Sequence, residues 1–312
     1  MYIEIEKVEI NLSKADVVYN NLVKDIVDNG IWDKDQTVRT KWKDESAAYT
    51  KSIVGAQLKF DNSELAILTC KEVKWKTAIK EMLWIWQKKS NIVQDLRDMG
   101  VNIWNEWELP DGTIGKAYGY QLGKPTLKAK VSDVSRLIED GFLSDNVTLI
   151  DGEYVLLDQV DYLLYQLKYN PASRRHITTL WSIEDLNEMS LTPCVWKTQW
   201  FVKENKLHLI VEARSNDIGI GHPFNVFQYN VLQRIFAQLL GYELGSYTFT
   251  IGDAHVYERH IEPLTQQTEL QQFEAPQLII NTEGKNFYDL TIDDFELVGY
   301  EHGPFIRMEI AI

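Results

Sequence analysis

The chain has 312 residues, of which 45% are hydrophobic and 25% are charged, and its formal net charge is -14. This composition predicts a globular protein with no global attraction for nucleic acid or for an anionic membrane. We find no run of about 18 apolar residues that could span a bilayer, and the first twenty residues lack the pattern of a signal peptide. Two cysteines do not make a disulfide framework, so we expect a cytoplasmic protein.

Apolar residues at helical spacing predict four helices. The strongest candidate lies within residues 71–90, where one face carries Ala78, Ile79, Met82, Leu83 and Trp86. The segment 225–242 is apolar nearly all round and is expected to be a buried helix. The other two are expected at 17–30, ending at Gly30, and at 158–176, ending near Asn170 and Pro171.

Strand-like segments lie at 176–182, 194–202, 206–215 and 246–257. In the third of these, apolar residues alternate with their neighbours, as at Leu207, Leu209 and Val211. Strands followed by helices without strict alternation indicate an α+β fold. The chain contains no repeat and no Pro/Ser-rich linker, so we expect a single domain over 1–312 with a surface insertion around 124–153.

The segment LTPCVWKTQWFV, residues 191–202, contains Cys194, one of the two cysteines. A thiol attacks only as the thiolate, so a nucleophilic cysteine needs positive or hydrogen-bonding surroundings. Its own strand offers Cys194 none, and a lone cysteine in an apolar strand is most often packed in the core. Taken by itself, this segment therefore favours core packing over a nucleophile.

The segment EARSNDIGIGHPFNVFQY carries groups suited to a phosphate and to a base edge. Arg214 and Ser215 can bind phosphate oxygens, and the amide of Asn225 offers both a donor and an acceptor. The alternative is an ordinary turn in which Asn225 caps the following helix.

Two further segments are weaker signals. Arg174 and Arg175 are adjacent in an acidic chain and suggest an anion site, with a solvated surface pair as the alternative. In GDAHVYERH, His255 and Tyr257 would share one face of a strand. His255 and His260 are poorly spaced as metal ligands on a strand, so we expect no metal.

Together these segments resemble the signatures of folate-dependent thymidylate synthases, the type with a cysteine nucleophile. The resemblance extends in order through VRTKW, FDNSELAILTCKEVKWKTAIKEMLWIW, GVNIWNEW, AYGYQ and the C-terminal MEIAI, and so spans nearly the whole chain. It is strongest to the subgroup found in Bacillus and some of its phages. It implies the fold of that family, a large mixed β-sheet flanked by helices, with two sheets packed back to back across a homodimer.

The resemblance also implies a role for particular residues. Cys194 would add to C6 of the uracil ring of dUMP, Asn225 would read uracil O4 and N3–H, and Glu81 would organise the waters of proton transfer. Asp217 and Tyr118 complete the implied catalytic set. The residues that would hold dUMP are Arg39, Arg214 and Ser215 at the phosphate, His255 and Tyr257 at the ribose, Gln199 and Asn225 in the cavity with Asp217, and Arg174 and Arg175 reaching in from the partner subunit.

The implied co-substrate is 5,10-methylenetetrahydrofolate, which supplies the carbon and the hydride. The residues that would contact it are Lys71 at the glutamyl tail, and Ile103, Trp104, Trp107, Leu191, Asp217, Gly221, Phe224 and Ile312 around the pterin. The implied products are dTMP and dihydrofolate. The chain departs from the commonest family pattern at Cys70, Asn105, Val195 and Ala213, and the last of these leaves the phosphate and ribose contacts less defined.

Two alternatives remain. A deoxyuridylate hydroxymethylase would share the fold and Asn225 but would trap the intermediate with water, and Trp104 with the intact Ile312 favours the synthase. A deoxycytidylate version usually carries aspartate at the position of Asn225. Members of this family can also bind RNA, but the -14 charge and the lack of a basic stripe leave that as a secondary role at most, with no obligatory nucleic acid partner.

Overall fold

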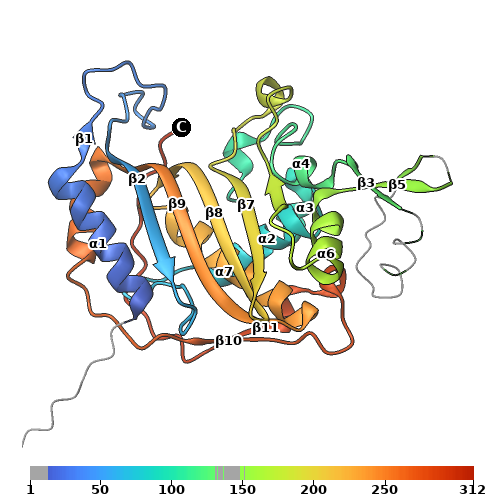
Figure 1. The fold of residues 1–312 in the computed structure, drawn as a ribbon. Helices are drawn as coiled ribbons and strands as arrows, with labels where there is room; N and C mark the ends of the chain where they lie inside the picture. The colour runs from blue at the N-terminus through green and yellow to red at the C-terminus, as the bar shows by residue number, and fades with distance from the viewer. Residues whose placement is uncertain (1–12, 131, 133–135, 137–147, 151) are drawn as a thin grey trace, which may run out of the picture.

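The computed structural model describes residues 13–130, 132, 136, 148–150 and 152–312. A six-stranded sheet forms its centre, in the order β1-β2-β9-β8-β7-β6 (Figure 1). Its strands β8 and β9 are parallel and the other neighbours are antiparallel, which confirms the predicted mixed sheet. The strands are β1 (Ile31–Trp32), β2 (Thr50–Phe60), β6 (His176–Thr179), β7 (Val195–Lys203), β8 (Lys206–Asp217) and β9 (Glu243–Tyr257).

The four predicted helices are present as α1 (Lys14–Asn29), α2 (Trp75–Trp86), α6 (Gln159–Tyr169) and α7 (Gly221–Leu240). Helix α7 connects β8 to β9, because two parallel strands need a long crossover. It begins at Gly221, earlier than predicted, so Asn225 lies inside the helix and is not its N-cap. It ends at Leu240 and is capped by Gly241, whose φ of 76° is the left-handed conformation that glycine adopts without steric cost.

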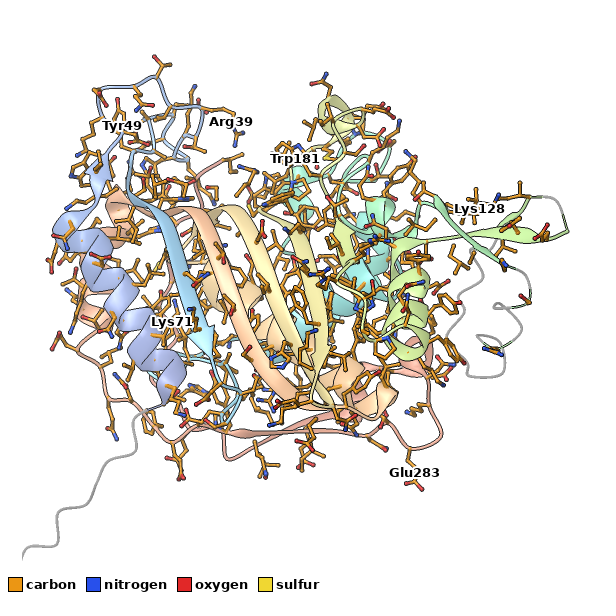
Figure 2. The ribbon with its side chains drawn as sticks, viewed as in Figure 1. Arg39, Tyr49, Lys71, Lys128, Trp181 and Glu283 are labelled. Atoms are coloured by element: carbon orange, nitrogen blue, oxygen red, sulfur yellow. The ribbon has the colours of Figure 1, made fainter. Side chains whose placement is uncertain are left out.

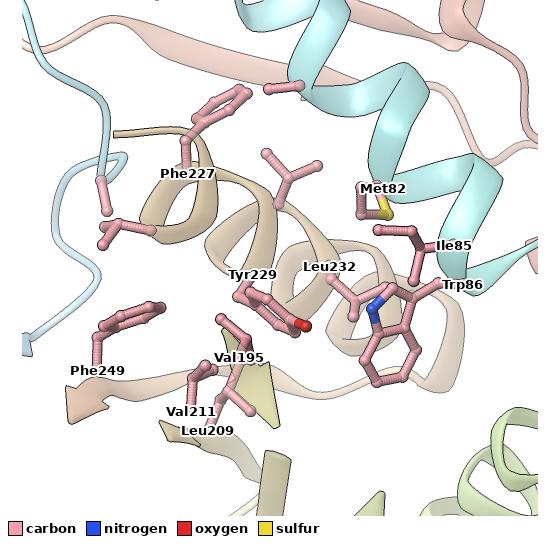
Figure 3. Packing of buried hydrophobic residues seen from close by; sticks show 14 of the residues in the cluster. Met82, Ile85, Trp86, Val195, Leu209, Val211, Phe227, Tyr229, Leu232 and Phe249 are labelled. Atoms are coloured by element: carbon pink, nitrogen blue, oxygen red, sulfur yellow. The ribbon is translucent and has the colours of Figure 1, made fainter. Parts of the chain in front are cut away.

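The hydrophobic core lies between the sheet, α7 and α2. Along β8, Leu207, Leu209 and Val211 are buried, while Ile210 points to the opposite face, as the alternation predicted. Figure 3 shows α7 lying between these strands and α2, with its side chains packed against both. The residues that meet in this layer include Met82, Trp86, Val195, Leu209, Val211, Phe227, Tyr229 and Leu232.

Several short elements surround this core. A separate three-stranded antiparallel sheet, β3 (Leu127–Lys130), β4 (Thr148–Leu149) and β5 (Tyr154–Leu157), projects from one side of the molecule (Figure 1). Most of the predicted insertion at 124–153 lies outside the described residues, so its role and the single-domain assignment stay predictions. The other α-helices and strands within the described residues are α3 (Val93–Asp98), α4 (Gly119–Gly123), α8 (Ile261–Gln267), β10 (Gln277–Ile280) and β11 (Phe295–Val298).

One edge of the large sheet collects the residues of interest. Strands β8 and β9 end there and β2 and β7 begin there, because β8 and β9 run antiparallel to their outer neighbours. The C-terminus lies at the same edge, at the top of Figure 1. Among the helices of the described residues, none is both apolar enough and long enough to cross a bilayer.

Candidate active site

Cys194 lies directly before β7, in a half-buried position at this edge. The pairing of β7 with β8 shifts register between Val195 and Lys197, which places a bulge just beyond the thiol. The backbone N–H of Arg214 donates to the carbonyl of Cys194 at 2.8 Å. The end of the strand therefore holds the thiol beside Arg214.

The side chain of Arg214 folds over the loop that carries the thiol. Its Nε donates to the Pro193 carbonyl at 3.0 Å, and its Nη2 donates to the carbonyl and to Oγ1 of Thr192, both at 2.9 Å. Burial raises the pKa of the Cys194 thiol, while the positive charge of Arg214 opposes that rise. The resting thiol is thus protonated, and Arg214 supplies the neighbouring charge that favours a thiolate.

Tyr118 adopts an unusual backbone conformation next to Cys194. Its φ is 46° although it is not a glycine, a conformation that costs about 1–3 kcal/mol and clusters at functional sites. Its hydroxyl accepts a hydrogen bond from the N–H of Cys194 at 3.2 Å, and its ring packs edge-on against Trp104 with centroids 5.0 Å apart. Tyr118 and Arg214, both predicted site residues, thus lie beside Cys194.

Glu81 is a buried carboxylate on α2 that receives two short hydrogen bonds. The indole N–H of Trp104 donates to Oε1 at 2.6 Å, and Nε2 of Gln228 on α7 donates to Oε2 at 2.6 Å. Burial raises the pKa of Glu81, and these two bonds hold it down. A buried carboxyl held by two donors is positioned to take part in proton transfer.

Asn225 is connected to Glu81 through Gln228. The Nδ2 of Asn225 donates to Oε1 of Gln228 in a long contact of 3.5 Å, and its Oδ1 accepts from Nδ2 of Asn216 at 2.9 Å. The sequence analysis did not identify Gln228. Gln228 could have been found from its spacing, because a residue three positions after Asn225 on a helix lies on the same face as Asn225.

Ser215 and His255 share the carboxylate of Asp253, which the sequence analysis also missed. Ser215 Oγ donates to Asp253 Oδ2 at 3.1 Å, and His255 Nδ1 lies 2.9 Å from the same oxygen. Burial lowers the pKa of His255, but the hydrogen bond to Asp253 and the charge of Asp217 outweigh burial and raise it overall. His255 and Tyr257 lie on one face as predicted, with ring centroids 5.3 Å apart. Asp253 could have been found from its two-residue spacing to His255 on a strand.

Asp217 shapes the turn between β8 and α7. Its Oδ1 accepts from the N–H groups of Gly219 at 2.8 Å and Ile220 at 3.3 Å. The Lys71 ammonium donates to the Gly219 carbonyl at 2.9 Å, and burial lowers its pKa to about 8. The Lys71 side chain is therefore buried, and its predicted contact with a glutamyl tail stays untested.

Backbone hydrogen bonds and a salt bridge hold the C-terminal segment at the sheet edge that carries Cys194. The N–H and carbonyl of Ile312 bond to the carbonyl and N–H of Lys41, at 2.9 and 2.7 Å. Glu309 forms a salt bridge with Arg259 at 2.8 Å, and a β-carbon at Gly219 would lie 2.9 Å from Met308 Sδ. Ile312 and the loop that carries exposed Arg39 therefore meet at the same edge, where Figure 2 also places Trp181.

Three of the predicted residues lie away from Cys194 in this chain. Gln199 pairs with Ile210, on the sheet face opposite α7, and its amide donates to the Arg174 carbonyl at 3.3 Å. Arg174 and Arg175 are exposed and precede β6, whose first residue pairs with Trp200. Six residues of extended strand separate this point from Cys194, or about 20 Å. Neither arginine can therefore reach the thiol of its own chain.

The predicted folate residues come from several separate segments of the chain. Trp104 and Trp107 contact each other with ring centroids 5.6 Å apart, and Ile103 beside them is 39% exposed. Gly221 and Phe224 lie in the first turn of α7, and Phe224 and Leu191 are half-buried against the core. Across the described part of the chain, no group of His, Cys, Asp or Glu side chains is arranged to hold a metal ion.

A family model described as thymidylate synthase matches residues 17–312. The chain belongs to the thymidylate synthase family. Thymidylate synthases from Bacillus subtilis subsp. natto and from Bacillus phage phi3T are 56% and 55% identical to it, each over 96% of this chain and the whole of the relative. The solved structure of the thermostable thymidylate synthase A from Bacillus subtilis superposes with a TM-score of 0.84 at 56% identity, over 96% of this chain and 99% of that one.

These comparisons confirm the resemblance inferred from the sequence and the thymidylate synthase fold. Membership in the thymidylate synthase family also makes the chain an enzyme of the methyltransferase class. Nothing in the comparisons favours a hydroxymethylase.

Proposed function

We propose that the chain catalyses the reductive methylation of dUMP to dTMP, with 5,10-methylenetetrahydrofolate as co-substrate and Cys194 as the nucleophile. The observation that carries the proposal is the position of Cys194 at the sheet edge. The thiol there lies beside the guanidinium of Arg214 and the hydroxyl of Tyr118. A thiol next to a fixed positive charge is activated for attack on an electron-poor ring carbon.

The nucleotide would lie along the ends of β8 and β9. Its phosphate would meet Arg214 and Ser215, helped by Arg39 from the loop above, and its ribose would meet His255 and Tyr257. A guanidinium suits a phosphate because its donors match two oxygens at once. Ser215 and His255 are already oriented by Asp253, so little side-chain ordering remains for binding.

The base would then extend from Cys194 toward Asn225 and Glu81. Asn225 would pair with uracil O4 and N3–H, while Glu81 would act on protons near O4 through water. Its two donors, Trp104 and Gln228, hold it in place for that work. The co-substrate supplies the carbon and the hydride, and Trp104, Trp107, Leu191, Phe224 and Ile312 would enclose its ring.

We also propose that the enzyme acts as a homodimer in the cytoplasm. Arg174 and Arg175 lie about 20 Å along the strands from their own Cys194, so they would serve the phosphate of the partner subunit. The sheet face that carries Gln199, opposite α7, is the surface on which a second sheet would pack. Cys70 and Cys194 are both free, as in a reducing compartment.

Replacement of the nucleophile tests the chemistry. Cys194→Ser should still bind dUMP but lose turnover, because a serine hydroxyl is a much weaker nucleophile than a partly ionised thiol. Product mass and dihydrofolate absorbance are measured together for the unaltered enzyme. A product heavier by one oxygen, with no dihydrofolate, would instead identify a hydroxymethylase, and turnover near the normal rate in Cys194→Ser would exclude Cys194 as nucleophile.

Subunit mixing tests the shared site. Arg175→Ala and Cys194→Ala homodimers should each be weak or inactive. A mixed dimer contains one site with an intact cysteine from one chain and an intact arginine from the other, so activity should recover to as much as one site per dimer. If mixed dimers form without recovery, Arg175 does not act across the interface.

A further inference from the structure

The amide of Asn225 must face one way to select uracil. Uracil presents the O4 acceptor and the N3–H donor, so Nδ2 of Asn225 must point to O4 and Oδ1 to N3–H. Cytosine presents the reverse pattern, an amino donor and an N3 acceptor. An asparagine turned by half a rotation about its terminal bond would therefore read cytosine as well as it reads uracil.

A chain of buried polar groups fixes this orientation from one side. The carbonyl of Ala78 can only accept, as does the ionised carboxylate of Glu81, so Gln228 directs Nε2 to them, at 2.9 and 2.6 Å. Its Oε1 is left to face Nδ2 of Asn225 at 3.5 Å. This long contact alone is a weak restraint, because hydrogen bonds weaken beyond about 3.2 Å.

The stronger restraint comes from the other side. Asn216 is 1% exposed and donates from Nδ2 to Oδ1 of Asn225 at 2.9 Å. Its own Oδ1 lies 2.6 Å from Nδ1 of His222, which is 2% exposed and stacks on Tyr19. Burial lowers the pKa of His222 to about 3, so the ring is neutral and carries one N–H, which this contact assigns to Nδ1.

We propose that Asn216 and His222 are positioning residues that hold the Asn225 amide in the uracil-reading orientation and thereby set the preference for dUMP over dCMP. The proposal rests on the proposed function, in which Asn225 contacts the base. With dUMP bound, Oδ1 of Asn225 accepts from Asn216 and from N3–H, and Nδ2 donates to Gln228 and to O4. Every donor and acceptor of the amide then has a partner, whereas the turned amide would set like groups against Asn216 and Gln228.

The test compares the binding constants of dUMP and dCMP by calorimetry in the absence of folate. Asn216→Ala removes the donor to Asn225, so the ratio of dUMP to dCMP affinity should fall about tenfold, with dCMP binding rising. His222→Leu should shift the ratio in the same direction. His222→Asn should restore it, because an asparagine Nδ2 can occupy the place of the histidine Nδ1 and donate to Asn216.

Asn230→Ala is the matched control. Asn230 is also a buried asparagine on α7, but it accepts from the N–H of Ala66 at 3.0 Å and donates to Asn62 at 2.6 Å, away from Asn225. It should lower the melting temperature and leave the affinity ratio unchanged. A purely structural role for Asn216 and His222 would act like this control and would make His222→Asn no better than His222→Leu.

The proposal is overturned if folded Asn216→Ala keeps a ratio within about twofold of the unaltered enzyme. If that variant does not fold, an unchanged ratio in His222→Leu overturns it equally. Turnover of dUMP by the unaltered enzyme is measured alongside. Failure of that turnover counts against the proposed function, while the two binding constants still judge the orientation of Asn225.

Discussion

Replacing Trp104 with phenylalanine should change how both activity and stability depend on pH. The indole N–H donates to the buried Glu81 carboxylate at 2.6 Å, and phenylalanine keeps the aromatic contacts while removing that donor. The bond stabilises only the ionised carboxylate. Loss of the bond from Trp104 should therefore raise the pKa of Glu81 further above its ordinary value. Only the bond from Gln228 would then remain to oppose the effect of burial on that pKa.

The magnitude follows from the kind of bond that is lost. A hydrogen bond to a charged group contributes about 1.5–3 kcal/mol, and each tenfold change in a proton equilibrium is about 1.4 kcal/mol. If Glu81 must be ionised in catalysis, the acid limb of the pH–rate profile of Trp104→Phe should move to higher pH by about 1–2 pH units.

Stability gives a second reading that does not depend on turnover. Because the folded pKa of Glu81 lies above its unfolded value, its stabilising contribution is present at low pH and is lost as the pH rises through the folded pKa. Trp104→Phe should therefore lose up to about 1.5–3 kcal/mol more than the unaltered enzyme between a pH below and a pH above the titration of Glu81. Urea unfolding at both pH values measures this difference.

The matched control is Trp107→Phe, since Trp107 packs against the ring of Trp104 with centroids 5.6 Å apart. It should change stability equally at both pH values. If Trp104→Phe shows no greater loss at high pH than Trp107→Phe, and its acid limb stays in place, then the hydrogen bond to Glu81 does not control the carboxyl.

Three further variants, two substitutions and one deletion, extend the tests. Arg214→Lys keeps the charge but cannot hold all three acceptors of the loop before Cys194, so urea unfolding should show a loss of about 1.5–3 kcal/mol; equal stability would contradict that clamp. Deleting Ile312 removes its two backbone bonds to Lys41, and KM for the folate should rise about tenfold with little change in melting temperature; an unaltered KM would argue against its place in the folate site. Asn225→Asp should shift the ratio of dUMP to dCMP affinity about tenfold toward dCMP, and an unchanged ratio would remove Asn225 from base recognition.

The long elements could be predicted from the sequence because their apolar spacing follows one period. Helix α2 and strand β8 each bury one face, and the apolar residues of that face recur along the sequence with the period of a helix or of a strand. Strand β2 was missed because it does not alternate. Only Leu58 and Phe60 are buried in it, and Gly55 interrupts its middle.

The candidate site was predictable in another way. Cys194, Arg214 and Asn225 were chosen because of their chemistry and because their surroundings resemble one family, and the comparisons confirm that family. Periodicity and spacing alone favoured a packed cysteine. The charge that could activate Cys194 comes from Arg214, twenty residues further along the chain. No local sequence pattern indicates that these two side chains lie close together.

The sequence by itself therefore determined the helices and strands that bury one face along their length, the family and the chemical groups present. Only the tertiary structure decided which of these groups meet. Gln228 reaches Glu81 across 147 residues because α7 packs on α2, and Asn216 reaches Asn225 because β8 turns sharply into α7. Such contacts depend on how two buried faces pack against each other. The residue pattern of one helix or strand shows which of its faces is buried, but not which other element packs on that face.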